Sequence, residues 1–558
     1  MFAEDLIATD IDEYLRQHEQ KTMLRFITCG SVDDGKSTLI GRLLYDSKAL
    51  LEDQLAAVEA DSRKWGTQGS ALDFALLVDG LAAEREQGIT IDVAYRFFAT
   101  EKRKFIFADT PGHEQYTRNM VTGASTADAA VILVDASKGL LTQTRRHSYL
   151  VSLLGIRNVI LAINKIDMTG FDGEVFRSIV RDYDKVASRL SFKSVTAIPV
   201  CAIDGDNVTS KSARTPWYEG PTLMHCLETM ELDDTSRQDS PFRMPVQWVN
   251  RPNKDFRGFC GTIAAGVVRP GDSIEVLPAR VATRVARVLT AAGEQPLAMA
   301  GQAVTITTTE EVDASRGCVL AAADSGAGIS SRLEASLVWM DQQPMEVGRP
   351  YLLKLGVTKA IAKVSAPRHR INPNTLDAVP AATLELNEIG SCVVSLDRTL
   401  SFQPYGTNRE LGGFILIDRL TDRTVAAGMV VAAANEVTAL RGSGAVWFVG
   451  RSPRAFVWRE ALVSLLVESG RAVCRFDPDA LSSADTAADH AAEVLRGLEH
   501  VEVATLIGPM VLSVSSDAAA RQLFPGAIFV DDEVMSRTTP GEAFAELVAR
   551  TSDKQRER

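Results

Sequence analysis

A run of eight residues near the start of the chain has the composition and spacing of a phosphate-binding loop. It reads Gly30-Ser-Val-Asp-Asp-Gly-Lys-Ser37, the pattern GxxxxGK[ST], and lies between an apolar run ending at Cys29 and the helical run Thr38–Leu44. Glycines let backbone N–H groups close around phosphate oxygens, the lysine supplies positive charge, and the serine hydroxyl can ligate Mg²⁺. A glycine-rich turn that merely precedes a helix is the alternative. The pattern with both flanks predicts a nucleotide site formed by Gly30, Ser31, Val32, Asp33, Asp34, Gly35, Lys36, Ser37 and Thr38.

A second motif, Asp109-Thr-Pro-Gly112, follows the apolar run Lys104–Ala108. The Asp109 carboxylate is therefore expected at the carboxyl end of a strand, where it can hold Mg²⁺ through water. Gly112 can offer its N–H group to a γ-phosphate. Taken alone, the motif is typical of an Asp-Pro-Gly turn. Its position after the phosphate-binding loop favours the nucleotide site.

A third motif, Asn164-Lys165-Ile166-Asp167, ends the apolar run Val159–Asn164. The Asp167 carboxylate can accept hydrogen bonds from guanine N1 and N2, which adenine cannot supply. Taken singly, the motif could be a helix start with an aspartate cap. In chain order after the first two motifs, it predicts GTP rather than ATP as the ligand.

The segment Ala83–Ile91, with the sequence AEREQGITI, resembles the first switch of translational GTPases of the elongation factor Tu type. The resemblance implies that Thr90 coordinates Mg²⁺ when GTP is bound, alongside Ser37 and Asp109. It also implies that His113, directly after the second motif, orients the attacking water. The alternative for His113 is a histidine that caps or packs a switch helix. The expected catalytic residues are thus Lys36, Thr90 and His113.

The same resemblance implies two further contacts with the nucleotide. Asp33 matches the family's loop aspartate, a candidate ligand of a monovalent cation. Cys201 and Ala202 fall where the family contacts the guanine carbonyl, with Cys201 in place of a serine. That departure is tolerable if a backbone N–H group makes the contact.

These motifs need a scaffold, and the first half of the chain alternates apolar runs with amphipathic segments. Such a rhythm is typical of βαβ units around a parallel sheet, so an α/β P-loop GTPase domain is expected. A closing helix is expected at Trp217–Met230 and a linker at Glu231–Ser240. The predicted strands are Arg25–Cys29, Lys104–Ala108, Ala130–Asp135, Val159–Asn164 and Ser194–Val200.

The pattern changes after Pro241, where short β-branched runs alternate with Gly and Pro up to about Val430. This predicts two small antiparallel β-barrels. An α/β pattern begins again after Gly442-Ser443-Gly444, with apolar runs at Ala445–Val449 and Ala472–Phe476. The expected parts are an N-terminal helical extension (1–22), the GTPase domain (23–235), two β-barrel domains (236–328 and 329–440) and a C-terminal α/β domain (441–558).

Two longer segments, Leu24–Asp46 and Thr215–Leu223, resemble the large GTPase subunit of bacterial sulfate adenylyltransferase. The resemblance covers about Asp10 to Val430. It implies that GTP hydrolysis drives the formation of adenosine 5′-phosphosulfate from ATP and sulfate, and that a small catalytic subunit carries the adenylyl transfer. In agreement, the sequence contains neither an SGGxDS loop nor an HxGH motif for a second nucleotide.

The C-terminal domain resembles adenylyl-sulfate kinase through Ala445–Gly450 and Phe476–Asp479, but its phosphate loop is degenerate. Phe456 and Val457 stand where that family has its phosphate lysine and Mg²⁺ hydroxyl. The alternative is that Arg451 or Arg454 replaces the lysine in a working site. We expect no kinase activity and an interaction or regulatory role instead, such as binding of the product.

The composition is that of an ordinary globular protein of 558 residues with a net charge of −12. This charge disfavours a protein wrapped in nucleic acid. No apolar run approaches the roughly 18 residues of a membrane span. Seven cysteines without a CxxC pair and an acidic start favour a cytoplasmic protein without disulfides or a zinc site. Two other functions stay open: a translation factor that delivers tRNA, and a regulatory GTPase scaffold.

Overall fold

The computed structural model describes residues 21–47, 62, 74–77, 90, 92–232, 237–254, 256–323 and 325–434, together with four short strands at 445–449, 475–476, 510–514 and 528–530. The chain divides into two compact units, Met1–Ala433 and Ala434–Arg558. The N-terminal extension expected at 1–22 lies almost wholly outside the described residues. So do the switch segment, apart from Thr90, and the phosphate loop of the C-terminal domain. No helix within the described residues is long and apolar enough to cross a membrane.

The first domain is built on a six-stranded sheet in the order β2-β3-β1-β4-β5-β6. Neighbouring strands are parallel except β2, which runs antiparallel to β3 at the edge. Every residue of β4 and β5 is buried, as expected for central parallel strands that read as continuous apolar runs. The strands are β1 (Met23–Cys29), β2 (Ala94–Ala99), β3 (Lys104–Asp109), β4 (Ala129–Asp135), β5 (Asn158–Asn164) and β6 (Ser194–Pro199).

Five of these strands lie where the sequence predicts them, whereas β2 was not among the predicted runs. Its side chains alternate between exposed and less exposed positions, and only Phe98 is buried. An antiparallel edge strand with this pattern does not give a continuous apolar run. The closing helix is also shorter than predicted, since α9 (Leu223–Thr229) begins only after Thr222, whose side chain accepts a hydrogen bond from His225 N.

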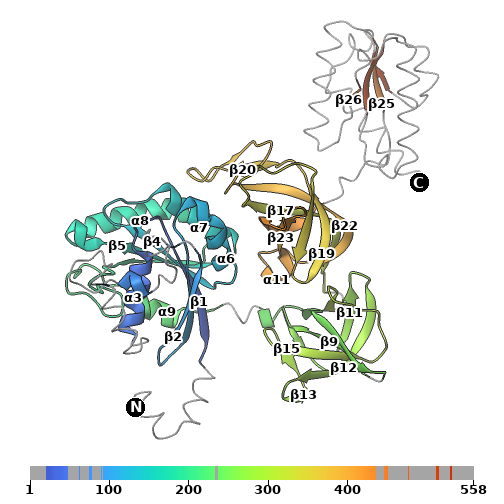
Figure 1. Cartoon of the computed structure of the whole chain (residues 1–558), viewed down its shortest axis with the longest axis horizontal. Coiled ribbons are helices and arrows are strands. Elements are labelled where there is room, and N and C mark those ends of the chain that lie inside the picture. The colour runs from blue at the N-terminus through green and yellow to red at the C-terminus, as the bar shows by residue number, and fades with distance from the viewer. Residues whose placement is uncertain are drawn as a thin grey trace. The chain divides into compact units, whose positions relative to one another are not determined.

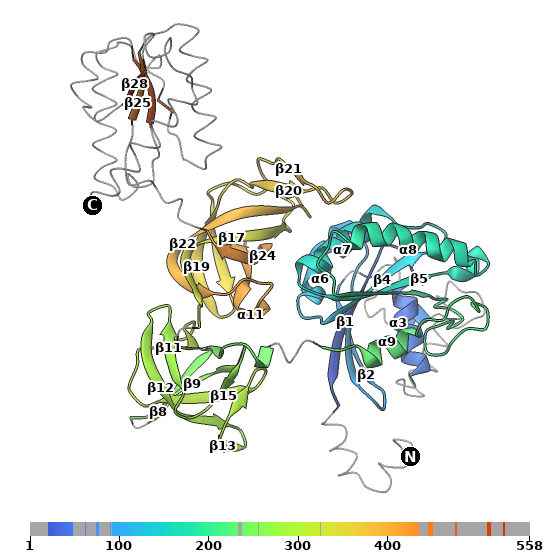
Figure 2. The same cartoon turned by 180° about the vertical axis from the view of Figure 1, so that it is seen from behind.

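Helices cover both faces of this sheet (Figures 1 and 2). On one face, α6 (Thr117–Ala124), α7 (Thr142–Leu153) and α8 (Gly173–Ala187) contribute side chains to one core cluster. On the other face, α3 (Lys36–Asp46) and α9 pack into a second cluster. This doubly wound arrangement brings the carboxyl ends of the parallel strands to one edge, where α/β proteins bind ligands.

The second domain is an antiparallel sheet in the order β7-β16-β11-β12-β15-β9-β8, with β13 beside β12 and a separate β10–β14 pair. Val246 N donates to Cys318 O at 2.8 Å and Gln247 N to Cys260 O at 2.8 Å, which links the two sides of the sheet. The strands are β7 (Arg243–Pro245), β8 (Trp248–Asn253), β9 (Phe256–Thr262), β10 (Val267–Val268), β11 (Ser273–Leu277), β12 (Val281–Thr290), β13 (Gly293–Gln295), β14 (Ala298–Met299), β15 (Ala303–Thr308) and β16 (Val319–Ala322).

The third domain forms a closed ring, because β17 pairs with both β24 and β22. Trp339, Tyr351 and Phe402 lie in its core. The expected β-barrel domains are therefore present. The elements are β17 (Gly328–Trp339), β18 (Pro350–Leu355), β19 (Thr358–Val364), β20 (His369–Ile371), β21 (Ala378–Val379), β22 (Ile389–Phe402), α11 (Arg409–Gly412), β23 (Gly413–Asp418) and β24 (Thr424–Ala433).

The described strands of the second unit form a sheet in the order β26-β27-β25-β28. All three neighbouring pairs are parallel. Parallel strands cannot be joined by a short hairpin and need longer crossover connections. Parallel pairing of this kind is typical of α/β domains. The strands are β25 (Ala445–Val449), β26 (Arg475–Phe476), β27 (Met510–Val514) and β28 (Ile528–Val530).

Candidate active site

The loop between β1 and α3 adopts backbone conformations that require glycine. Gly35 has a φ of 87°, and a Cβ atom there would lie 2.4 Å from the Asn164 Nδ2 atom. Asp33 also has a positive φ, 66°, and is exposed. Ser31 N donates to the Asp34 carboxylate at 2.6 Å. The side chains of Val32 and Thr38 are half-buried. The loop is thus compact and lies directly before the amino end of α3. The free N–H groups at that end of the helix favour the binding of an anion.

Lys36 is the buried cation of this loop, 7% exposed. Its Nζ atom donates to Ser31 O at 2.7 Å and lies 3.4 Å from Gly30 O. Burial lowers the pKa of Lys36, and the nearby Asp109 and Asp34 carboxylates oppose that shift. A Cβ atom on Gly112 would lie 2.5 Å from Nζ. Gly112 of the second motif and Lys36 of the first therefore border the same small space.

Three oxygen-bearing side chains from separate segments meet beside Lys36. The Ser37 hydroxyl lies 3.1 Å from Asp109 Oδ2 and 3.3 Å from Thr90 Oγ1, and Thr90 Oγ1 lies 3.4 Å from the same carboxylate oxygen. Burial raises the pKa of Asp109, whereas Lys36 and the hydroxyls of Thr28, Ser37 and Thr90 favour its ionised form. Hydroxyl and carboxylate oxygens are the ligands that Mg²⁺ prefers. The three residues expected as metal ligands thus lie together and fit this ion.

Thr28 is a member of this cluster that the sequence analysis missed. Its hydroxyl donates to Asp109 Oδ1 at 3.1 Å, because Thr28 and Asp109 face each other in the register of β1 and β3. The Thr110 hydroxyl in turn donates to Thr28 O at 2.5 Å. In the sequence, Thr28 is a threonine one residue before the end of the first predicted strand. Whether its hydroxyl reaches Asp109 depends on the register of the two strands, which the sequence does not give.

His147 on α7 is a second residue that the sequence analysis missed. It is fully buried, its Nδ1 atom accepts from Gly30 N at 3.2 Å, and its Nε2 atom lies 3.0 Å from the Gln143 amide. Burial, reinforced by Lys36 and Arg146, lowers the pKa of His147 to about 3. The ring is therefore a neutral acceptor that anchors the start of the phosphate-binding loop.

His113 lies in the loop that follows Gly112, immediately before the 3₁₀ turn Glu114–Tyr116. Its ring is half-buried, and its Nδ1 atom accepts from Gln115 N at 3.2 Å. The ring lies 5.9 Å from that of Tyr116, centroid to centroid. With Nδ1 accepting, the ring proton is on Nε2. That nitrogen is then the donor available to a water molecule.

Asn164 forms hydrogen bonds with two separate segments of the site. It is 2% exposed, its Nδ2 atom donates to Asp34 O at 2.8 Å, and its Oδ1 atom accepts from Ala202 N at 3.0 Å. Asn164 thereby joins the phosphate-binding loop to the segment after β6. These two hydrogen bonds position both segments relative to each other.

Lys165, Asp167, Cys201 and Ala202 form the neighbouring part of the site. Lys165 has a φ of 58°, and its Nζ atom pairs with Asp135 Oδ2 at 3.0 Å. Burial, reinforced by the half-buried Asp167 carboxylate, raises the pKa of the Cys201 thiol to about 12. Cys201 is thus a neutral thiol in the place of the family's serine.

Two apolar side chains beside these residues are exposed, Met168 at 65% and Ile203 at 39%. Each directly follows a predicted site residue in the chain, Asp167 and Ala202 respectively. Exposed large apolar groups next to a polar recognition site are suited to contact a planar ligand. Neither side chain can be recognised from the sequence, because an apolar residue in a loop carries no signal of exposure.

Comparison with known protein families supports this arrangement. Residues 21–239 match the family described as "Elongation factor Tu GTP binding domain", and residues 332–431 match "GTP-eEF1A C-terminal domain-like". These matches cover the first and third domains. The order of domains fits the fold of translational GTPases, as the sequence predicts.

Among curated proteins, this chain is similar to "Sulfate adenylyltransferase subunit 1" of Francisella tularensis subsp. novicida, with 54% identity over 76% of this chain and 90% of the relative. The protein of the same name from Tolumonas auensis is 54% identical over 77% of this chain and 91% of the relative. The "Bifunctional enzyme CysN/CysC" of Xylella fastidiosa is 57% identical over 74% of this chain and 66% of the relative. The chain therefore belongs to the family of sulfate adenylyltransferase subunit 1.

Proposed function

We propose that this chain binds GTP with Mg²⁺, hydrolyses it, and couples the hydrolysis to formation of adenosine 5′-phosphosulfate from ATP and sulfate on a partner catalytic subunit. The observation that carries the proposal is the convergence of Lys36, Ser37, Thr90 and Asp109 at one point, from three separate segments. Membership of the family supports the coupled reaction. The cytoplasm, where ATP and GTP are available, is the proposed location.

In this proposal each group has a defined task in phosphoryl transfer, which depends mainly on positioning and charge neutralisation. The loop N–H groups and Lys36 hold the β- and γ-phosphate oxygens. Ser37, Thr90 and Asp109 would hold Mg²⁺, which neutralises charge on the same oxygens. Gly112 offers its N–H group to the γ-phosphate, and His113 orients the attacking water.

Recognition of the base is assigned to the Asp167 carboxylate, which accepts from guanine N1–H and N2–H₂. The Lys165 stem, Met168 and Ile203 supply apolar surface for the ring. The neutral Cys201 thiol lies near Asp167 and can donate a hydrogen bond to its carboxylate. Asp33 is the proposed ligand of a monovalent cation.

For the C-terminal domain we propose a degenerate adenylyl-sulfate kinase-like fold without kinase activity. Its first strand β25 lies between β27 and β28, as β1 lies between β3 and β4 in the first domain. This supports a common strand order for the two domains. The proposed domain boundaries remain 23–235, 236–328, 329–440 and 441–558, although β17 begins at Gly328, one residue before the third domain.

The test uses the full chain purified with the subunit that accompanies it. Pyrophosphate release from ATP and sulfate should rise when GTP is added, and GTP turnover should be detectable. Lys36→Ala should abolish GTP turnover and the GTP-dependent part of synthesis, because Lys36 is the main side-chain charge on the phosphates. Lys185→Ala, an exposed lysine paired with Asp182, is the matched control. Unchanged GTP turnover in Lys36→Ala would refute the assignment of the loop.

A further inference from the structure

The loop between β22 and β23 touches both other domains of the first unit. It is closed on itself by Gln403 N, which donates to Leu411 O at 3.0 Å. Leu411 is 3% exposed and packs into a cluster with Ala264, Leu277, Val319 and Ala321 of the second domain. The Asn408 amide donates to Ala264 O at 3.3 Å. One short segment of the third domain is therefore fixed to the second.

Arg409, the next residue, reaches the first domain instead. Its Nη1 atom donates to Ala127 O at 2.7 Å, and its Nη2 atom donates to Gly155 O. These carbonyls lie just beyond the carboxyl ends of α6 and α7, where helix dipoles favour a cation. Gly155 has a φ of 76°, and a Cβ atom there would lie 3.0 Å from Arg409 Nε. The planar guanidinium thus bridges two helix ends at once.

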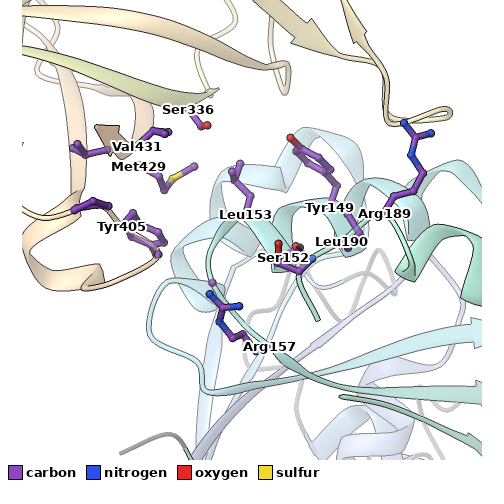
Figure 3. Close-up of a pocket in the computed structure, with 15 residues that line it drawn as sticks. Tyr149, Ser152, Leu153, Arg157, Arg189, Leu190, Ser336, Tyr405, Met429 and Val431 are labelled. Carbon is purple, nitrogen blue, oxygen red and sulfur yellow. Dashed lines mark hydrogen bonds between the residues drawn. The ribbon is translucent and has the colours of Figure 1, made fainter. Parts of the chain in front are cut away.

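Tyr405 lies beside Arg409 in the same contact with the first domain. Tyr405, 7% exposed, donates its hydroxyl to Leu154 O at 3.3 Å. On one side of Tyr405 is a cavity of about 460 Å³, in which Tyr405 and Met429 face Leu153 (Figure 3). On the other side is a cavity of about 680 Å³ that Arg118 of α6 also lines. Met340, Tyr405 and Met429 also pack into the core cluster of the first domain, so the Arg409 hydrogen bonds add direction and charge to an apolar contact.

Helix α6 connects this contact to the candidate active site. It begins at Thr117, directly after the loop that carries Gly112 and His113, and it ends at Ala124, close to the Arg409 contact. With 1.5 Å of rise per residue, the helix spans only about 12 Å. A shift of its carboxyl end would therefore be transmitted to His113.

We propose that Arg409 is a positioning residue for GTP hydrolysis, which holds the carboxyl end of α6 and thereby keeps the His113 loop in the orientation that hydrolysis requires. The inference rests on the proposed GTPase function. It also makes the loop between β22 and β23 a link that joins the first domain to both barrels. Arg409 touches no reacting atom in this scheme and acts through α6.

The test compares Arg409→Met with the wild-type full chain in the complex. Methionine keeps apolar bulk but leaves both carbonyls without their charged donor. We expect kcat for GTP hydrolysis to fall about tenfold, while the affinities for GTP and GDP change less than about twofold. Arg409→Lys, which keeps the charge, should recover part of the rate. The control is Arg368→Met, an exposed arginine of the same domain paired with Glu334.

Tyr405→Phe removes only one hydroxyl and keeps the inference testable if Arg409→Met does not fold. We expect a fall in kcat of about twofold, again without a change in nucleotide affinity. Amides of α6 should also exchange faster in the Arg409 variant. A wild-type kcat in folded Arg409→Met or in Tyr405→Phe, or an equal fall of rate and affinity, would overturn the inference. No GTP turnover in the wild-type chain would instead overturn the proposed function beneath it.

Discussion

At the scale of single residues, burial and neighbouring charges have opposite effects on the ionisation of Lys36 and Asp109. Burial by itself favours the neutral forms of Lys36 and Asp109, while each charge stabilises the other. A bound metal ion would add positive charge beside Asp109 and keep the carboxylate ionised. The cluster is therefore suited to a ligand that brings both phosphate and a divalent cation.

The role proposed for His113 predicts different effects on the rate of hydrolysis and on the affinity for GTP. In the proposed mechanism it acts on water and does not touch the nucleotide, so His113→Ala should lower kcat by about a hundredfold and leave GTP affinity nearly unchanged. The measurement is single-turnover hydrolysis together with equilibrium binding of a fluorescent GTP analogue. His225→Ala on α9 is the matched control. An equal loss of affinity and rate would reassign His113 to packing of the switch segment.

Asp167 decides which base is accepted. Asp167→Asn should weaken GTP by at least tenfold and improve xanthosine triphosphate, because the amide can donate to the xanthine 2-oxo group. Competition between the two nucleotides measures the change. Cys201→Ser is the control, since it replaces a neutral thiol near Asp167 by a neutral hydroxyl, and it should keep the preference for GTP. A mutant that still prefers GTP would place recognition elsewhere.

At the scale of elements, α7 supports the phosphate-binding loop through His147. The folded protein holds His147 neutral at a pKa of about 3, so the unfolded chain binds the extra proton below about pH 6.5. The stability that the neutral ring contributes is therefore present above pH 6.5 and is lost as pH falls from there toward 3.

His147→Gln removes this titrating group. The advantage of the wild type over the variant in free energy of unfolding should shrink by about 1.4 kcal/mol per pH unit below pH 6.5. Amide exchange of α7 in the full chain, at pH 7.5 and 5.5, measures the free energy of opening for both proteins. An advantage that does not change with pH would mean that His147 is not held neutral in the folded state.

At the scale of the whole molecule, the chain separates into units at Ala434. Truncation after Arg441 should therefore leave GTP turnover within about twofold of the full chain, because separate units fold on separate cores. Turnover and thermal unfolding of the first unit are the measurements. Loss of the folded GTPase on truncation would show that the C-terminal unit stabilises the rest of the chain.

The full chain should also fail to phosphorylate adenylyl sulfate. Phe456 and Val457 stand where the kinase family has its lysine and its Mg²⁺ hydroxyl, and Pro453 lacks an N–H group. Incubation with ATP and adenylyl sulfate should give no 3′-phosphorylated product, and Phe456→Lys with Val457→Ser should not restore it. Product from the unmodified chain would make the protein bifunctional.

The nucleotide-site motifs, the α/β and barrel architecture and the family could all be predicted from the amino-acid sequence. Those signals are local: glycines, a lysine and carboxylates at fixed spacing, and apolar runs long enough to form central strands. The edge strand β2 could not be predicted in this way, because its side chains alternate in exposure and form no continuous buried run.

The contacts between residues of distant segments, in contrast, become visible only in the folded chain. Thr28 reaches Asp109 through strand register, His147 reaches Gly30 from α7, and Arg409 reaches Ala127 across a domain contact. A lone threonine, histidine or arginine in a helix or strand has no spacing pattern, because its partners are many residues away. Their roles follow from the packing of the sheet and the barrels, which brings those partners within hydrogen-bond distance.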